Sequence, residues 1–235
     1  IQTIAPPDHL IYKAIEIGGD YAHEMSVASR LVIANMMCET GAKCGILPPD
    51  QVVADYLEEK LCSLASDPDA GYADRYEVDL DALEPVLACP HAVQNVKNVT
   101  EVEGVKIQQA FLGSCTNGRI EDFLQAAEIL RGQKIHPNVR MIVVPGSQTI
   151  YLEMARMGLL EMFTECGAAV LSPGCASCGG FGPGTIGNDE VCISTTNRNW
   201  QGRMGPKSSS VYLGSAYSVA AAAVAGEIVS PLRYL

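Results

Sequence analysis

Three of the nine cysteines in this sequence stand in turns built from small residues. Cys115 lies in the segment GSCTNG, and Cys175 and Cys178 lie in PGCASCGG. Glycines allow backbone amides to approach a bulky anionic group closely, and each amide can donate a hydrogen bond to a sulfide or a thiolate. These three thiols are therefore the residues of the chain best suited to bind a metal centre.

The Cys-x-x-Cys pair alone does not decide which centre is bound, because it serves zinc, disulfide exchange and iron–sulfur clusters alike. Disulfide exchange favours such a pair at the start of a helix, and the prolines and glycines around Cys175 fit that poorly. A structural zinc normally has four protein ligands, and none of the four histidines lies beside these turns: His9, His23, His91 and His136.

Three thiolates instead suit an iron–sulfur cubane whose fourth iron has no protein ligand. Electron-transfer clusters normally use four cysteines. A missing fourth ligand leaves one iron open to water or substrate, and that iron then acts as a Lewis acid.

The other six cysteines are expected to be small buried hydrophobic residues, as is common for free cysteine. They are Cys38, Cys44, Cys62, Cys89, Cys166 and Cys192. An odd number of cysteines cannot pair completely within one chain, and the sequence begins without a signal-peptide pattern. We therefore expect thiols that are kept reduced in the cytoplasm.

The segment TTNRNWQGR contains Asn197, Arg198 and Arg203 directly after a predicted strand. Arginine binds carboxylates through two parallel hydrogen bonds. In a chain with a net charge of -11, this basic loop favours a di- or tricarboxylate substrate. The alternative is a surface loop whose arginines pair with nearby acidic residues.

Asn35 and Glu39 form a further candidate pair, since residues four apart share one face of a helix. Glu39 stands in a largely apolar window over residues 31–45. The alternative is a solvated helix face on which Lys43 pairs with Glu39.

The elements that position the cysteine and arginine loops are strands alternating with helices. Strands are predicted over residues 105–112, 139–144, 168–171 and 191–195, with helices over 120–130 and up to Met157. This alternation predicts an α/β fold of three-layer α/β/α type, with a mostly parallel sheet covered on both faces. Ligands of such sheets bind beyond the carboxyl ends of the strands. Five candidates come just after a predicted strand: Cys115, Cys175, Cys178, Asn197 and Arg198.

The first part of the chain has a different, mostly helical pattern. Helices are predicted over residues 28–37 and 51–64, an acidic surface stretch over 66–81, and an extended connection over 83–98. We expect two domains, over residues 1–95 and 96–235.

Composition excludes several classes of protein. Of the 235 residues, 48% are hydrophobic and 18% are charged, which is enough apolar material for a buried core and excludes overall disorder. The net charge of -11 opposes nucleic-acid binding. The longest apolar run, around residues 219–225, predicts a buried helix and is too short to span a membrane.

The chain resembles the aconitase superfamily, in which GSCTNGRIED, PGCASC and TTNRNWQGR occur in this order. The likeness is strongest to the large subunits of isopropylmalate isomerase, homoaconitase and related dehydratases. ANMMCETGAKCGILPPD resembles the segment that precedes the cluster domain in these proteins. The resemblance covers essentially all 235 residues. It implies the C-terminal part of a second aconitase-like domain over 1–95 and the third, iron–sulfur domain over 96–235.

The resemblance also implies the roles of individual residues. Cys115, Cys175 and Cys178 would bind a [4Fe-4S] cluster with one labile iron. Substrate carboxylates would be bound in a pocket lined by Asn197, Arg198 and Arg203. The implied catalytic residues are Asn35 and Glu39, which would lie near the open iron and contact its water or the substrate hydroxyl.

The implied reaction is that of a hydro-lyase, in which dehydration and rehydration of a hydroxy acid move its hydroxyl to the neighbouring carbon. The open iron makes hydroxide a better leaving group, and a base takes the proton from the adjacent carbon. We expect isopropylmalate as the substrate, in leucine biosynthesis, with homocitrate or a dimethylmalate-type acid as alternatives. A hypothesis of another class is a non-catalytic, iron-sensing RNA-binding protein; the net charge and the lack of a basic stripe oppose it.

The chain departs from the family pattern in two ways. Family large subunits are longer, with a His-rich N-terminal domain, and the catalytic serine belongs to a separate swivelling small subunit. We therefore expect this chain to be a C-terminal part that is inactive without those partners. The segment GGFGPGTIG after Cys178 differs from the commoner large-subunit pattern, which affects the choice of subfamily.

Overall fold

The computed structural model describes residues 10–60 and 65–235, and the chain divides into two compact units, residues 1–82 and 83–235. The sequence suggested a domain boundary later, after residue 95. The difference arises from residues 83–98, expected as a connection, which contribute the strands β3 (Val86–Ala88) and β4 (Val96–Asn98) to the sheet of the second unit.

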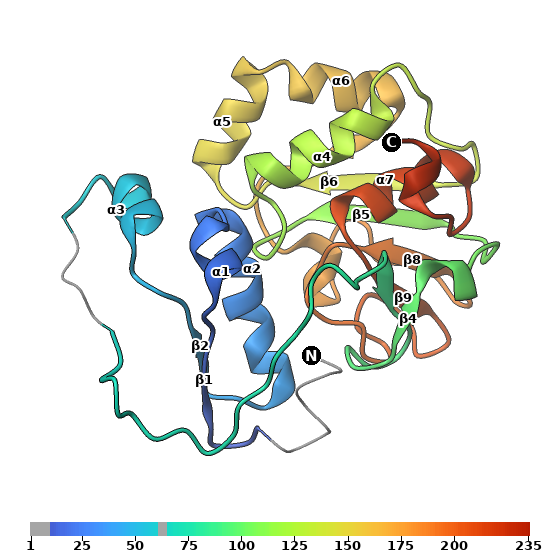
Figure 1. Ribbon diagram of the computed structural model, residues 1–235. Coiled ribbons are helices and arrows are strands. Elements are labelled where there is room, and N and C mark those ends of the chain that lie inside the picture. Colours follow the sequence, from blue (N-terminus) through green and yellow to red (C-terminus); the bar gives the residue numbers. More distant parts are fainter. Residues whose placement is uncertain (1–9, 61–64) are drawn as a thin grey trace. The chain divides into compact units, whose positions relative to one another are not determined.

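The first unit is a small α/β arrangement. Strands β1 (Ala14–Glu16) and β2 (Cys44–Ile46) form a parallel pair, accompanied by helices α1 (Asp20–Glu24), α2 (Val27–Met37) and α3 (Gln51–Leu57) and the 3-10 helix η1 (Cys38–Thr40) (Figure 1). The helix predicted over residues 28–37 is confirmed as α2. That predicted over 51–64 ends at Leu57, because Glu58 takes a left-handed conformation with φ 54°. Residues 61–64, including Cys62, lie outside the described residues.

A buried arginine holds the first unit together. The Arg30 side chain donates five hydrogen bonds: to both carboxylate oxygens of Asp50, at 2.8 and 2.9 Å, and to the carbonyls of His23, Met25 and Pro48. Asp50 also caps α3, since its carboxylate accepts from the backbone of Val52. The polar groups of this unit are thus extensively paired.

The second unit contains a seven-stranded sheet in the order β4-β3-β9-β8-β5-β6-β7. The five strands β5 (Gln109–Gly113), β6 (Arg140–Val144), β7 (Ala169–Val170), β8 (Val191–Ser194) and β9 (Ser210–Leu213) are mutually parallel. Strand β3 pairs antiparallel with both β9 and β4. The predicted α/β fold with a mostly parallel sheet is confirmed. All four predicted strands are present, whereas β9 was missed.

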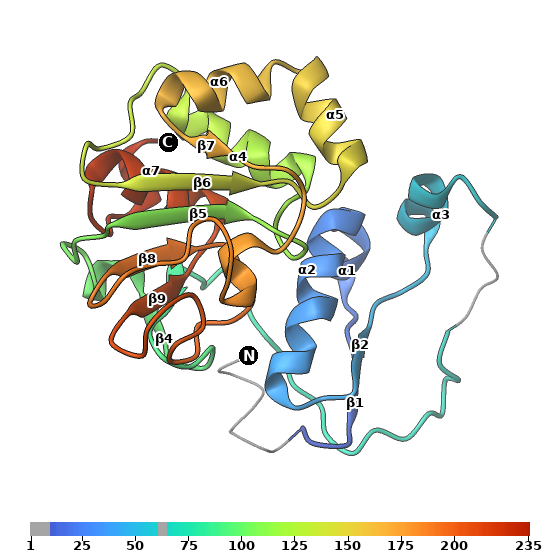
Figure 2. The same cartoon turned by 180° about the vertical axis from the view of Figure 1, so that it is seen from behind.

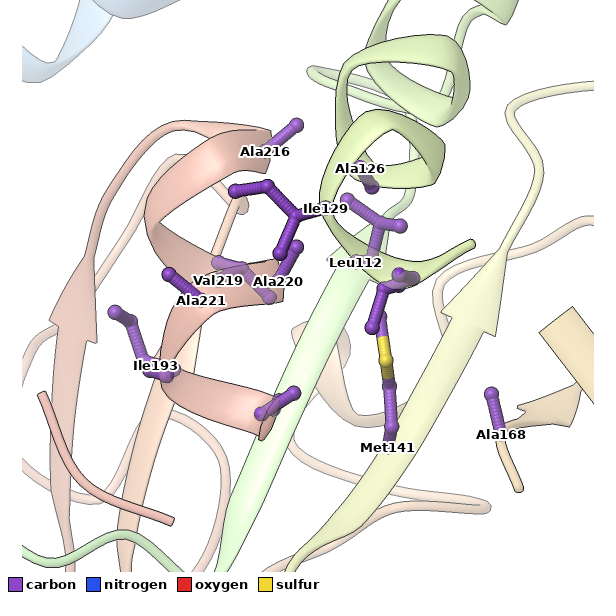
Figure 3. Packing of buried hydrophobic residues seen from close by; sticks show 14 of the residues in the cluster. Leu112, Ala126, Ile129, Met141, Ala168, Ile193, Ala216, Val219, Ala220 and Ala221 are labelled. Carbon is purple, nitrogen blue, oxygen red and sulfur yellow. The ribbon is translucent and has the colours of Figure 1, made fainter. Parts of the chain in front are cut away.

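Helices cover one face of this sheet. Figure 1 shows α4 (Ile120–Leu130) and α7 (Ala216–Ala225) in front of the strands, and Figure 2, from behind, shows β5, β6 and β8 in front of these helices. Helices α5 (Gln148–Arg156) and α6 (Leu159–Cys166) follow β6, and α6 packs on α4 and β7. In Figure 3, Ile129 of α4 lies among the alanines of α7, whose small side chains allow close packing.

Loops cover the other face, where the three-layer arrangement would place helices. The loop after the 3-10 helix η3 (Ala176–Gly179) packs there: the side chain of Gln109 donates to the carbonyl of Gly184 at 2.6 Å. A Cβ added at Gly184 would lie 3.2 Å from Ile142. Within the described residues, the buried apolar side chains of these loops are Ile186 in the loop after η3 and Met204 in the loop between β8 and β9. None of the helices in the described chain is long and apolar enough to cross a membrane.

Candidate functional site

The cysteine loops and the arginine loop open at one edge of the sheet. Cys115 follows β5, Cys175 and Cys178 follow β7, and Asn197 and Arg198 follow β8. Because β5, β6, β7 and β8 are parallel neighbours, the carboxyl ends of these strands meet at the same edge. The predicted convergence of these loops is thereby confirmed at the level of topology.

The three thiols differ in exposure. Cys115 and Cys175 are exposed, whereas Cys178 is buried within η3. Among the described residues, no group of three or more histidine, cysteine, aspartate or glutamate side chains is placed to hold a single metal ion. A cubane binds each cysteine through a different iron, so its thiolates need not converge on one point.

Each cysteine loop contains a strained residue beside its first cysteine. Ser114 has φ 72° and Ala176 has φ 44°, both in the left-handed region that residues with a Cβ rarely occupy. Such conformations cost about 1–3 kcal/mol and persist where the surrounding structure imposes them, often at functional sites.

The loop of Cys115 is pressed against the loop after β6. A Cβ added at Gly118 would lie 2.2 Å from the carbonyl oxygen of Ser114 and 2.9 Å from the amide nitrogen of Gly146. The Gly146 amide also donates to the Gly118 carbonyl at 2.9 Å. Only glycine allows this close approach of two backbones.

Arg119 and Asp122 fix the end of the Cys115 loop where α4 begins. The Arg119 guanidinium donates to the carbonyls of Cys115 and Thr116, at 3.2 and 2.7 Å, and its backbone amide donates to the Asp122 carboxylate. Burial raises the pKa of Asp122 to about 6, against smaller lowering contributions from Arg119. The sequence analysis missed both residues, although they belong to the quoted segment GSCTNGRIED.

Direct hydrogen bonds join the cysteine loop to the arginine loop. The Asn117 amide donates to the carbonyl of Thr195 at 2.6 Å, and the Thr195 hydroxyl accepts from the amide of Gly113 at 2.8 Å. The position of the first cysteine and that of the arginine loop are therefore coupled through two short contacts.

The predicted substrate residues lie in the loop between β8 and β9. Asn197 is buried, and the Arg198 guanidinium stacks 5.4 Å from the centre of the Trp200 ring, which restricts its direction. The Nε atom of Arg203 is buried and has no hydrogen-bond partner among the described residues. A buried donor without a partner is costly, and an anionic ligand would satisfy it.

The residues of these loops fit an iron–sulfur cluster. The donor set is three soft thiols. The hydroxyls of Ser114 and Ser177, which neighbour the cysteines in sequence, are buried without hydrogen-bond partners in the described chain. These hydroxyls and the glycine-rich backbone are hydrogen-bond donors in the same loops as the cysteines, and a sulfide or thiolate can accept from such donors.

Asn35 and Glu39 belong to the first unit. Asn35 lies in the last turn of α2, and Glu39 lies in η1, so the two residues are on consecutive helical turns. Both are half-buried. Lys43 places its amino group 4.8 Å from the ring centre of Tyr12. The role of Asn35 and Glu39 stays a prediction.

Of the six remaining cysteines, Cys62 lies outside the described residues, and the other five divide into two groups. Cys89, Cys166 and Cys192 are buried as expected, and burial raises the pKa of all three thiols, that of Cys192 to about 12. The expectation is wrong for Cys38 and Cys44, which are exposed. They lie at the end of α2 and in β2, where the small first unit offers little depth in which to bury them.

The structure is thus a mostly parallel α/β domain in which three cysteines and a basic loop follow strands that end at one edge of the sheet. The sequence matches the aconitase family (aconitate hydratase) over residues 7–104 and 92–226, and the chain belongs to this family.

Relatives are large subunits of two kinds of enzyme. The chain is 47% identical to "3-isopropylmalate dehydratase large subunit 2" of Rubrobacter xylanophilus over 92% of the chain and 52% of that protein. It is 43% identical to "3-isopropylmalate dehydratase large subunit 1" of Thermotoga maritima, over 100% of the chain and 58% of that protein. It is 44% identical to "Probable methanogen homoaconitase large subunit" of Methanosarcina mazei, over 94% of the chain and 57% of that protein. The chain thus spans about half the length of these relatives.

Proposed function

We propose that this chain is the cluster-bearing part of a hydro-lyase that dehydrates and rehydrates a hydroxy di- or tricarboxylic acid. The observation that carries the proposal is the junction of the cysteine and arginine loops through the 2.6 Å bond from Asn117 to the carbonyl of Thr195. This bond would couple the proposed cluster site to the proposed carboxylate site at one sheet edge. Family membership supports the same conclusion.

Cys115, Cys175 and Cys178 would hold a [4Fe-4S] cluster. When bound, a cluster with one iron lacking a protein ligand supplies Lewis-acid chemistry toward the substrate hydroxyl. The glycine-rich backbone of both loops gives the cluster close access to the chain.

Arg198 and Arg203 would bind the substrate carboxylates, and Asn197 would line the same pocket. Arg198 is oriented by Trp200, and Arg203 offers a buried, unpartnered Nε within the described chain. A planar guanidinium matches a carboxylate with two parallel hydrogen bonds, which fixes the direction of the bound acid.

Asn35 and Glu39 would contact the substrate hydroxyl or the water bound beside it. In its acid form, the carboxyl group of Glu39 can donate the proton with which the hydroxyl leaves as water, and the resulting carboxylate can take a proton back from water on rehydration. The base that removes the proton from the neighbouring carbon would come from a small subunit, and the complete enzyme would also need the remaining half of the large subunit.

Isopropylmalate is the substrate we propose, which would place the enzyme in the cytoplasmic synthesis of leucine. Two of the relatives above are named as 3-isopropylmalate dehydratase large subunits. Homocitrate is the alternative, because a third relative is named as a homoaconitase. A dimethylmalate-type acid is a further alternative.

The test is turnover by the assembled enzyme. The full-length large subunit that contains this chain is prepared anaerobically with its small subunit and offered isopropylmalate, homocitrate and dimethylmalate. We expect one acid to be converted with the highest kcat/KM. The variant Arg198→Lys should raise KM for that acid at least about tenfold, because lysine lacks the bidentate fork.

Arg131→Lys is the matched control, since Arg131 is exposed at the end of α4 and away from the loops. Its kinetics should equal those of the native enzyme. Absence of turnover with all three acids, or an unchanged KM in Arg198→Lys, would contradict the proposed function.

A further inference from the structure

Asn199 is a buried amide in the middle of the arginine loop, and neither the sequence motifs nor the proposed reaction gives it a role. Its side chain is fully buried. Its Nδ2 donates to the carbonyl of Cys89 at 2.8 Å, and lies 3.3 and 3.4 Å from the carbonyls of Ala88 and Ala92. One side chain thus contacts a segment about 110 residues away in the sequence.

The carbonyls that Asn199 contacts belong to the turn after β3. Ala88 pairs with Leu213, the last residue of β9, so this turn lies at the carboxyl edge of the parallel strands. The turn is closed by its own hydrogen bond, from the amide of Cys89 to the carbonyl of Asn95 at 2.7 Å. Asn199 therefore fastens the arginine loop to a preformed part of the sheet edge.

The segment 195–199 is held at both ends. At one end, Thr195 is bound by Asn117 and by the amide of Gly113. At the other end, Asn199 is bound to the turn after β3. Asn197 and Arg198 lie between these two attachments, so their backbone direction depends on both.

We propose that Asn199 is a positioning residue, which sets the direction of Asn197 and Arg198 toward the substrate carboxylates. The inference rests on the proposed function. The contacts also specify asparagine: the amide NH₂ faces carbonyl oxygens, whereas Oδ1 has no partner among the described residues. Aspartate has the same shape but only accepts hydrogen bonds, so it would repel the same carbonyls.

The kinetic test compares Asn199→Ala, Asn199→Asp and Gln201→Ala in the assembled, cluster-loaded enzyme with isopropylmalate. Gln201 is the matched control, because it is an exposed amide of the same loop that donates to the carbonyl of Lys207. We expect KM to rise about tenfold in Asn199→Ala and further in Asn199→Asp, with kcat within about twofold. Gln201→Ala should behave as the native enzyme.

The order of the two variants separates positioning from packing. If Asn199 only filled space, the isosteric aspartate would be milder than alanine. Native kinetics in Asn199→Asp, or a loss confined to kcat, would overturn the proposal.

Hydrogen exchange provides a readout that does not depend on catalysis. In the protein without substrate, peptides covering residues 88–95 and 195–203 should exchange faster in both Asn199 variants than in the native protein. Peptides of α4 should exchange at the native rate. Unchanged exchange would overturn the attachment itself. Absence of turnover in the native enzyme would overturn the proposed function and, with it, the substrate role of Asn199.

Discussion

The two compact units bury charge and polarity in opposite ways. In the first unit, the carboxylate of Asp50 is paired with Arg30, whose guanidinium holds the pKa of Asp50 well below its usual range. In the second unit, Asp122 is half-buried and its carboxylate accepts a hydrogen bond from the backbone amide of Arg119, yet desolvation raises its pKa to about 6. One unit uses buried charge for its stability, whereas the other tolerates a costly group next to a candidate site.

The same contrast holds for polar atoms and the apolar core. Buried side-chain atoms without a hydrogen-bond partner, among the described residues, all lie in the second unit: Gln109, Ser114, Ser177, Asn199 and Arg203. This unit also has the large apolar core around α4, α7 and β5. In the first unit, the described core cluster consists of Leu10 and Ala42, with Ile15 packed against it. A large core can offset strain and unpaired polar groups at a site, and a small one cannot.

The largest expected effect is on cluster assembly. Cys175→Ala should abolish stoichiometric iron and sulfide after anaerobic reconstitution, because it removes one of three ligands. Cys192→Ala is the control, since that thiol is fully buried in β8, and it should retain both. Unchanged iron and sulfide in the first variant would show that the edge loops do not bind the cluster.

The next largest effect is on stability, through the close backbone approach at Gly118 in the Cys115 loop. Gly118→Ala should lower the free energy of unfolding by about 2–3 kcal/mol, because its methyl group would meet the Ser114 carbonyl. Gly174→Ala lies in the other cysteine loop with no atom within 4 Å of the added carbon, and should change stability by less than about 0.5 kcal/mol. Equal denaturation midpoints for the two variants would refute the packing described for these loops.

In the first unit, Asp50→Asn should destabilise by about 2 kcal/mol, because it leaves the buried Arg30 charge unpaired. Hydrogen exchange in peptides of α2 and α3 would measure the loss. His23→Ala removes only an exposed partner of Asp50 and should have little effect.

This Asp50 contribution also depends on pH. The folded-state pKa is lowered, so the stabilisation is present above the unfolded pKa of about 3.9 and is lost as the pH falls through the folded value. An opening free energy of these helices that is equal in acid and at neutral pH, after correction for the intrinsic pH dependence of amide exchange, would exclude this role of the carboxylate.

The contribution of Asp122 to stability should depend on pH in the opposite direction to that of Asp50. Its folded pKa of about 6 lies above the unfolded value, so the second unit should lose up to about 2 kcal/mol of stability as the pH rises between roughly 4 and 6. Asp122→Asn should remove this slope in denaturant titrations. A native-like slope in the variant would assign the pH dependence to another group.

Much of the second unit could be predicted from sequence, because its strands are short apolar runs and its site residues follow them directly. Cys115 and Arg198 were placed at the sheet edge only because they follow predicted parallel strands, whose carboxyl ends meet at one edge. Strand β9 was missed because Ser208, Ser209 and Ser210 give its start a polar, turn-like pattern. Asn117, Arg119 and Asn199 were not recognised as loop attachments, since their partners are backbone carbonyls, which leave no trace in residue type.

In the first unit, prediction failed where local conformation decided the outcome. The helix from Gln51 ends early because Glu58 adopts a positive φ, which no pattern of apolar residues indicated. Cys38 and Cys44 were expected inside a core that is too small to hold them.

The central claim is that Cys115, Cys175 and Cys178 hold a cluster with one open iron. The most direct measurement is anaerobic reconstitution of this chain with iron and sulfide, followed by metal analysis and by EPR after mild oxidation. We predict a three-iron signal that disappears when ferrous iron restores the fourth site. Stoichiometric zinc without sulfide, and without that signal, would contradict the account.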